Sequence, residues 1–423
     1  MADMSSMNRE NKKKQLRRQI VSSDSGSRPP QNYSEDAEDA ARKVYKKVRM
    51  RRLFLLLLLL LLLGAGTFGW FYYQKNYEFG SYETAWTIDM KEGSLVGYES
   101  FGNNVLKVTR DGASYIDNKG KTIWTESYEM KNPIVSVKGN YAAIADRQSN
   151  SIYICNTDGT QGSVTTVLPV SRVAVSGTGV VAAVMEDSTS SYIYFFRKDG
   201  TVLDVQVKTN MGGNGYPLDI SLSGDGTQLM ASYVFIQNGE LRNRVVFYDF
   251  SEIGKNIPNR LVGGFDEQFQ GTIVGEVQYI GAPYSCAFSG SGLTFFSSKN
   301  IASPELVAQV PVEEEIQSVF HSDEYAGVIV KNNSGEYGNR MEIYKKSGEL
   351  VMKKDFTYDY TAVDIDGDLV ILYNEDSCKI YNMSGVLKLY ASFDFTVSKI
   401  RKGSFPNTLV VTGPQAMKEI KLR

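Results

Sequence analysis

The stretch SYIYFFRKDGTVLDV, residues 191–205, indicates how the chain folds. Aromatic and β-branched residues fill its first half, a Lys-Asp-Gly turn follows, and a second apolar run comes after the turn. This is the pattern of two antiparallel strands joined by a tight turn. It recurs as ASYIDNKGKTIWTES, SIYICNTDGTQGSVT, MEIYKKSGELVMKKD and CKIYNMSGVLKLYAS, and in two divergent copies, RVVFYDFSEIGKN and LTFFSSKNIASPELV.

The turns of these copies set the length of the repeat. Their spacing is roughly 37 to 51 residues, which is typical of β-propeller blades with four strands each. The turns lie near Gly120, Gly159, Gly200, Ser251, Asn300, Gly348 and Gly385.

A second hairpin precedes most of these copies. The stretch DISLSGDGTQLMAS, residues 219–232, resembles the Ser-x-Asp-Gly-x-x-Leu hairpin found in many propeller families. Small residues follow these turns, as expected for inner strands that crowd around a propeller axis. They include Ala142, Ala143, Ala182, Ala183 and Ala231.

The two ends of the domain indicate that the ring closes. Residues 399–423 contain about three strands, and the run at 83–90 places Trp86, Ile88 and Met90 on one face of a lone strand. This strand is expected to complete the last blade, because closure leaves no sheet edge exposed. The predicted fold class is all-β, a closed β-propeller of about eight four-stranded blades. Seven blades, or a pair of β-sandwiches, are the alternatives.

An apolar segment precedes this domain. It has no charged residue from Leu53 through Leu58 and Leu63 to Tyr73, and Trp70 lies near its aromatic end. Such a segment is roughly 31 Å long as a helix, enough to cross a bilayer core. The aromatic end suits the headgroup layer. We therefore predict one transmembrane helix.

The charges that flank this segment predict its orientation. Positive residues mark the cytoplasmic side, so we expect the N-terminus inside the cell and the propeller outside the cytoplasm. A cleaved signal peptide is the alternative, but its basic region would begin nearer the N-terminus and its apolar core would be shorter. The basic residues before the span are Arg42, Lys43, Lys46, Lys47, Arg49, Arg51 and Arg52.

Four segments follow from these features. Residues 1–52 form a basic tail with 14 Lys and Arg against 7 Asp and Glu, disordered at first and then helical. Residues 53–73 form the span, 74–82 a tether and 83–423 the propeller. The tail's charge suits topology and anionic lipid, and nucleic-acid binding is not expected.

The sequence offers little chemistry. His321 is the single histidine, which excludes a multi-histidine metal site. The three cysteines are widely spaced and fit buried thiols. Residues 364–375 space aspartates as a calcium loop does, but Leu369 replaces the required glycine, so a hairpin is preferred to a calcium site. We predict no catalytic residue and no cofactor.

Two loops carry exposed-type aromatics. Asn214, Tyr216 and Pro217 lie in the Gly-rich stretch NMGGNGYPLD, and Tyr284 lies in GAPYSC. Aromatic residues in propeller loops make good contact anchors, so these four residues are our prediction for a binding face. Packing between blades is the alternative role for each of them.

The whole layout resembles bacterial membrane-anchored proteins with a WD40-like or quinoprotein-like propeller, in particular a family of unknown function from Gram-positive anaerobes. The resemblance implies no catalytic residues. We expect a non-catalytic binding or scaffolding module of the cell envelope, with a single membrane span and an envelope protein or glycan as partner. The alternatives are an envelope hydrolase or quinoprotein-like oxidoreductase that uses the propeller channel, and a sensor that signals through the basic tail.

Overall fold

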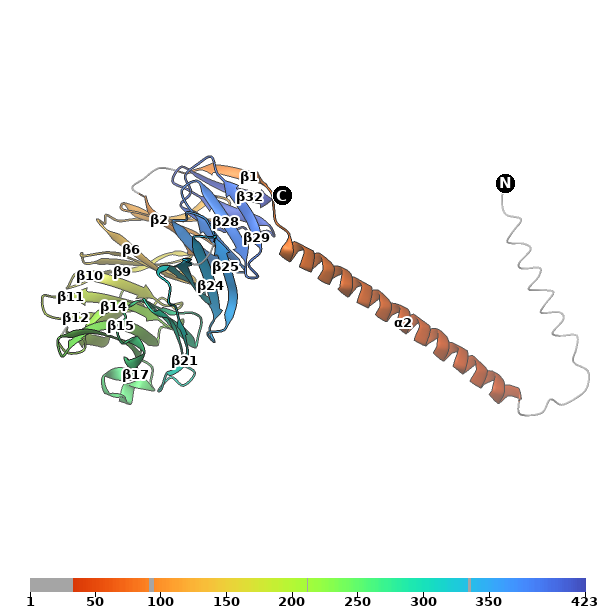
Figure 1. Ribbon diagram of the computed structural model, residues 1–423, viewed down its shortest axis with the longest axis horizontal. Helices are drawn as coiled ribbons and strands as arrows, with labels where there is room; N and C mark the ends of the chain where they lie inside the picture. The colour runs from red at the N-terminus through yellow and green to blue at the C-terminus, as the bar shows by residue number, and fades with distance from the viewer. Residues whose placement is uncertain (1–32, 91–94, 211, 334–335) are drawn as a thin grey trace, which may run out of the picture. The chain divides into compact units, whose positions relative to one another are not determined.

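The chain has two compact units, Met1–Lys75 and Asn76–Arg423. The structure, a computed structural model, describes residues 33–90, 95–210, 212–333 and 336–423. The described part of the first unit consists of helix α2, Tyr33–Asn76, up to its last residue but one, and the strands belong to the second unit (Figure 1). The predicted disorder before residue 33 lies outside the described residues.

Helix α2 joins the helical part of the tail to the apolar segment without a break. Leucine loses little side-chain freedom in a helix, which explains why the leucine run supports one continuous element. Its segment Arg42–Asn76 is long and apolar enough to cross a membrane, and its leucine side chains are exposed.

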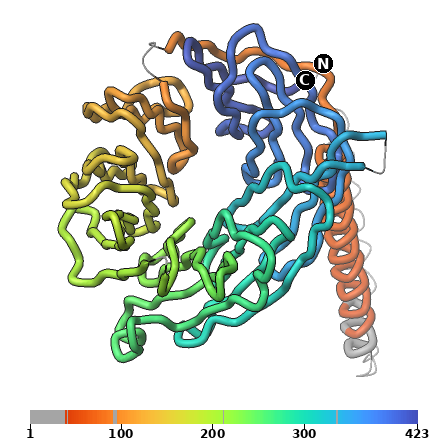
Figure 2. Tube along the Cα trace, turned by 60° about the vertical axis from the view of Figure 1, so that its left-hand side comes forward, coloured from red at the N-terminus to blue at the C-terminus, as the bar shows by residue number. Residues whose placement is uncertain are grey.

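The second unit contains eight antiparallel sheets of four strands each. Seven sheets use four consecutive strands, and the eighth has the order β1-β32-β31-β30. The prediction of an eight-bladed propeller is confirmed, and the seven-bladed and sandwich alternatives are wrong. Figure 2 shows the chain passing round the ring until its end meets the start of the domain.

Blades 1 to 4 consist of β2 (Leu95–Phe101), β3 (Asn104–Thr109), β4 (Gly112–Ile116) and β5 (Thr122–Ser127); β6 (Pro133–Lys138), β7 (Tyr141–Asp146), β8 (Ser151–Asn156) and β9 (Gly159–Thr165); β10 (Val170–Val175), β11 (Val181–Glu186), β12 (Ser191–Phe196) and β13 (Val202–Thr209); and β14 (Tyr216–Leu222), β15 (Gln228–Gln237), β16 (Glu240–Asp249) and β17 (Leu261–Phe265). Blades 5 to 8 consist of β18 (Val274–Tyr279), β19 (Tyr284–Ser289), β20 (Gly292–Ser297) and β21 (Glu305–Pro311); β22 (Ile316–His321), β23 (Tyr325–Lys331), β24 (Asn339–Lys345) and β25 (Leu350–Phe356); β26 (Ala362–Asp366), β27 (Leu369–Tyr373), β28 (Ser377–Asn382) and β29 (Leu387–Ser392); and β30 (Lys399–Lys402), β31 (Thr408–Thr412), β32 (Ala416–Leu422) and β1 (Tyr82–Asp89). Short 3₁₀ helices are η1 (Gly254–Asn256), η2 (Pro258–Arg260) and η3 (Glu267–Phe269).

The strand order defines two faces of the ring. The first strand of each blade begins at face A, which carries the loops between blades, such as 210–215, and the turn at 238–239. It ends at face B, which carries the turns after the first and third strands, such as 322–324 and 197–201. The repeated turns predicted from the sequence all join a third strand to a fourth, so they lie on face B.

Each of the eight interfaces between blades holds one buried apolar cluster. The predicted small residues are fully or almost fully inaccessible, for instance Ala143, Ala183 and Ala231 at 0% exposure. They lie on second strands, which neighbouring blades cover on both sides, and the first strands line the centre of the ring. Sheet-on-sheet packing therefore holds the ring together all the way round.

The segment before β1 is attached to the ring. The buried Phe79 joins the cluster between blades 7 and 8, and its backbone N–H donates to the Lys388 carbonyl at 2.9 Å. Arg423 exchanges two backbone hydrogen bonds with Ser81. The residues predicted as a tether thus include a docked stretch.

Candidate functional site

A cavity of about 730 Å³ lies in the centre of the ring. First strands of all eight blades line it, so each blade contributes side chains to one shared space. Its ionisable lining groups are the acids Glu99, Asp219, Glu276, Asp323, Asp364 and Asp366, the bases Lys138, Arg147, Arg172 and Lys399, and His321.

Three consecutive blades place a charged residue at one structural position. Arg172 on β10, Asp219 on β14 and Glu276 on β18 each directly follow a bulge in the first strand. A bulge redirects the side chain that follows it. The repeat therefore brings one base and two acids to the same level of the cavity.

The pKa values of the two acids, Asp219 and Glu276, are raised. Burial raises the pKa of Asp219 to about 6, although the backbone N–H of Val277 donates to its Oδ2 at 2.9 Å and Arg172 opposes the rise. Burial raises the pKa of Glu276 to about 7, and the charge of Asp219 adds to this rise. Near neutral pH the first carboxyl is thus mainly ionised and the second is half protonated.

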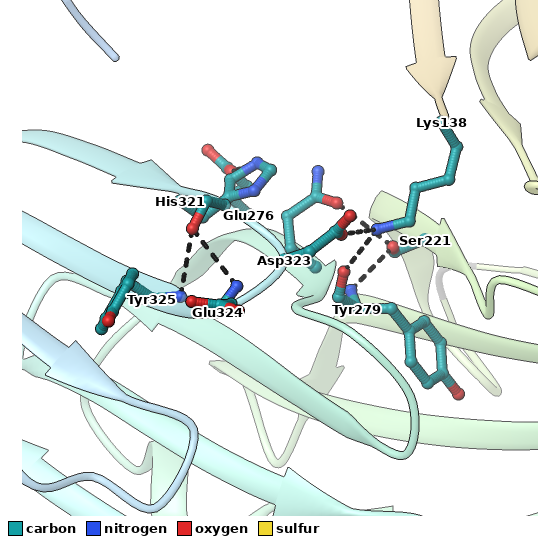
Figure 3. Close-up of polar contacts among 10 residues, drawn as sticks. Lys138, Ser221, Glu276, Tyr279, His321, Asp323, Glu324 and Tyr325 are labelled. Carbon is teal, nitrogen blue, oxygen red and sulfur yellow. Dashed lines mark hydrogen bonds and ion pairs between the residues drawn. The ribbon is translucent and has the colours of Figure 1, made fainter. Parts of the chain in front are cut away.

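His321 lies beside this pair. Its Nε2 is 3.5 Å from Oε1 of Glu276, across the interface between blades 5 and 6 (Figure 3). Burial lowers the pKa of His321 to about 4, and the nearby Lys138 lowers it further. The imidazole is therefore neutral at pH 7, and the contact is a polar one between blades instead of an ion pair.

Lys138 crosses the cavity at face B. Its Nζ donates to the Tyr279 carbonyl of blade 5 at 2.8 Å and to Oδ1 of Asp323 at 2.9 Å, at the opposite side of the ring (Figure 3). A second cavity, of about 360 Å³, is also lined by Lys138 and Asp323. The bridge therefore lies between the central cavity and this second cavity.

The acids on the other side of the ring have partners. Lys399 Nζ donates to Oδ1 of Asp364 at 3.0 Å, and the Tyr373 hydroxyl donates to its Oδ2 at 3.0 Å. The backbone N–H of Lys402 donates to Asp366 at 2.7 Å. Charges in this half of the cavity are thus used to join blades 7 and 8.

The predicted binding-face residues divide between the two faces. Tyr216 begins β14 at face A, with exposed Asn214 before it and buried Pro217 after it. Its hydroxyl donates to Oε1 of Glu186 at 2.5 Å, and it lies close enough to Arg172 to feel its charge. Tyr284 begins β19 at face B, half-buried, with Lys299 Nζ 5.6 Å from its ring centre. The strands do not bring these two tyrosines together.

The sequence reasoning missed Arg172, Asp219 and Glu276. Each opens a four-residue run that ends its first strand, RVAV, DISL or EVQY. Aligning first strands from blade to blade would have exposed this recurring charged position. A search for contiguous motifs does not reveal this position, because each blade contributes only one residue to it.

The aspartates of the calcium-like stretch form a hairpin. Asp366 pairs with Leu369 across the turn between β26 and β27, as preferred from the sequence. Among the residues that the structure describes, no group of three or more His, Cys, Asp or Glu is arranged to hold a metal ion. All three cysteines are buried, and burial raises their thiol pKa values.

The predicted membrane and topology residues all lie on helix α2. Basic residues from Arg42 to Arg52 precede Leu53, Leu58 and Leu63 along it, and Trp70 and Tyr73 follow near its C-terminal end. Each of these side chains is exposed, as a lipid-facing helix requires. Their position in a membrane and the orientation of the helix stay predictions.

The comparison with protein families decides the assignment of the chain. Residues 75–422 match a model described as "Family of unknown function (DUF5711)". The chain belongs to this family. The match spans the whole propeller, and the resemblance inferred from the sequence is confirmed. No curated protein matches the sequence.

Solved structures show the same fold at low sequence identity. Sqt1 from Chaetomium thermophilum has a TM-score of 0.52 and 10% identity, covering 81% of this chain and all of that one. The same protein bound to the N-terminus of ribosomal protein L10 gives 0.49 and 10%, covering 77% of this chain and 92% of that one. BamB from Moraxella catarrhalis gives 0.48 and 12%, with coverage of 81% and 100%. These likenesses concern the fold alone.

Proposed function

We propose that this DUF5711 protein is a membrane-anchored, extracytoplasmic binding module that docks an envelope protein through face A of its propeller. The observation that carries the proposal is the hairpin β15–β16. Its strands are 10 residues long, whereas the other strands have 4 to 8. It therefore extends beyond the turns of neighbouring blades, close to the predicted binding loop.

The tip of this hairpin is apolar. Ile236 and Leu241 face each other across the ladder and are 53% and 58% exposed. Arg244 stacks on Phe235 with its guanidinium carbon 3.7 Å from the ring centre, which stiffens the base of the hairpin. A rigid hairpin with exposed apolar side chains is a typical anchor for a protein interface. The apolar helix α2 supplies the means of attachment to a membrane.

Crosslinking in intact cells tests this proposal. The full chain is crosslinked, purified in detergent and examined for covalently attached protein, alongside the double variant Ile236→Asp, Leu241→Asp. We expect a reproducible partner with the native chain and its loss with the double variant. The matched control is Val202→Asp, which changes an equally exposed apolar residue on β13 and should keep the partner. A partner retained by the double variant would contradict docking at the hairpin.

One observation favours an envelope hydrolase as a second candidate. Asp219 and Glu276 lie in one cavity with their pKa values raised to about 6 and about 7. A mainly ionised and a half-protonated carboxyl form a suitable general base and general acid. This candidate predicts that the native chain hydrolyses an envelope polymer and that Asp219→Asn abolishes the hydrolysis without changing the fold. That result would favour a hydrolase over the binding module.

A further inference from the structure

We infer that the central cavity binds a small zwitterion of the α-amino acid class, with its ammonium group between Asp219 and Glu276 and its carboxylate on Arg172. This goes beyond the docking function, because it concerns the inside of the ring and not its face. The ligand class follows from two features of the cavity: its charged side chains that lack an ion-pair partner, and its size.

The charges on β10, β14 and β18 are available to a ligand. Among the described residues, no acidic oxygen lies within 4.0 Å of the Arg172 guanidinium. Asp219, at the equivalent position on the next blade, is near enough to feel its charge and accepts a hydrogen bond from the backbone N–H of Val277, but has no basic side chain within that distance. Glu276 has only the long contact to neutral His321. By contrast, Asp364 and Asp366 on the other side are held by β30. Unpaired charge in a partly buried space is unfavourable, and a ligand of opposite charge relieves it.

The presence of both signs selects a zwitterion over simpler ions. A plain amine would be attracted by the two carboxyls but repelled by Arg172. A plain anion would meet six acidic side chains against four basic ones in the lining. A metal ion would lack the required set of three ligands within the described part of the chain. A molecule that carries an ammonium and a carboxylate satisfies all three side chains at once.

The volume of the cavity agrees with a small ligand. A cavity of about 730 Å³ is in the range that holds small molecules. The Lys138 bridge to Tyr279 and Asp323 spans face B. The bridge obstructs this face, so we place the entry of the ligand at face A, where Tyr216 begins the strand that carries Asp219.

Calorimetric titration of the full chain in detergent micelles tests the inference. The probes are the common L-amino acids, with 1,5-diaminopentane as an amine without carboxylate and glutarate as a carboxylate without amine. We expect at least one amino acid to bind and both single-sign probes to fail. Arg172→Gln and Glu276→Gln should each weaken binding by about tenfold or more, the effect of losing one charge-assisted hydrogen bond.

Matched controls change the same residue types outside the cavity. Arg197→Gln and Glu305→Gln alter exposed side chains and should leave affinity unchanged. If Arg172→Gln fails to fold, Arg172→Lys keeps the charge and should retain part of the affinity. Binding of the diamine as tightly as any amino acid, equal binding by the cavity variants, or no amino acid bound would each overturn the inference. None of these outcomes affects the crosslinking test, which probes the hairpin on face A.

Discussion

Three ionisable residues in the central cavity show how one environment acts differently on acids and on a base. Asp219, Glu276 and His321 come from consecutive blades and lose contact with water to similar extents. Burial disfavours the charged form of any group, so it raises the pKa of the two acids and lowers that of the histidine. The cavity can therefore change its charge near neutral pH by titrating its carboxyls, while His321 stays neutral there.

The variant Glu276→Gln should be more stable than the native chain at high pH. The pKa of Glu276 is raised from 4.5 to about 7 in the folded protein, so folded protein binds this proton more tightly than the unfolded chain does. The carboxyl then reduces the free energy of unfolding progressively as the pH rises from 4.5 to 7. We expect the melting temperature of the variant to exceed the native value by about 1–2 °C above pH 7.

The pH dependence of this difference separates the charge effect from a packing effect. The difference should shrink as the pH falls towards 4.5 and vanish below it, where Glu276 is protonated in both the folded and the unfolded native chain. Asp219, His321 and Lys138 surround the site and are unchanged in both proteins. Glu305→Gln, on the exposed outer strand β21, should show no difference at either pH. A stability gain that is independent of pH would show that the carboxyl's charge is not its origin.

At the scale of elements, turn glycines pack four of the blades against the blade before. Gly120, Gly200, Gly348 and Gly385 have φ between 75° and 85°, a region that favours glycine. Each also approaches the outer strand of the preceding blade. A Cβ on Gly200 would lie 2.4 Å from the Ser163 carbonyl of β9, and one on Gly348 would lie 2.5 Å from Ala308 of β21. The repeated glycine is thus needed for blade packing as well as for the turn.

Gly200→Ala should destabilise the propeller through both effects. The positive φ costs about 1–3 kcal/mol for a residue with a Cβ, and the contact with the Ser163 carbonyl adds a similar overpacking term. Gly139→Ala is the control, because its φ is 58° and open space surrounds its Cβ position. Chemical unfolding of both variants measures the difference. Equal losses at the two sites would rule out the close approach as a cause.

The same glycines explain why the elements were predictable and the cavity was not. A turn with positive φ requires Gly or Asn at a fixed position. The hairpins formed by the third and fourth strands of the blades could therefore be recognised from residues such as Gly120 and Gly385. The charged position after the bulge carries Arg, Asp or Glu in different blades, with no shared residue type. Tyr216 was found because an aromatic in a glycine-rich loop is conspicuous. Its neighbours Arg172 and Asp219 lie inside otherwise ordinary strands.

At the scale of the whole molecule, β1 closes the ring. It pairs with β32 from Tyr82 to Asp89, and the Trp86 Nε1–H donates to Oε2 of Glu419 at 2.7 Å. The Tyr98 hydroxyl of blade 1 donates to the Gly413 carbonyl of blade 8 at 3.0 Å. Closure was predictable because the sequence leaves three strands at one end and one at the other. The docking of Phe79 was not, since it depends on a pocket between blades 7 and 8.

A chain that begins at residue 90 should lose much of its stability relative to one that begins at Asn76. Removing 76–89 deletes β1 and Phe79, which uncovers Met417 and Ile420 and leaves β32 as an exposed edge. The loss should exceed the 3–5 kcal/mol or so that truncation of a single buried aromatic costs. An exposed edge strand also favours association between chains, so light scattering should rise together with the fall in melting temperature.

A synthetic peptide of residues 79–90 provides the control for this comparison. If β1 acts by completing blade 8, the peptide should bind the shortened chain, restore its melting temperature and suppress scattering. A peptide with Trp86→Ala should do so less well, because it loses the bond to Glu419 and the packing against Tyr98 and Met417. If the shortened chain has the same melting temperature as the longer one, the other seven interfaces hold the ring together without closure.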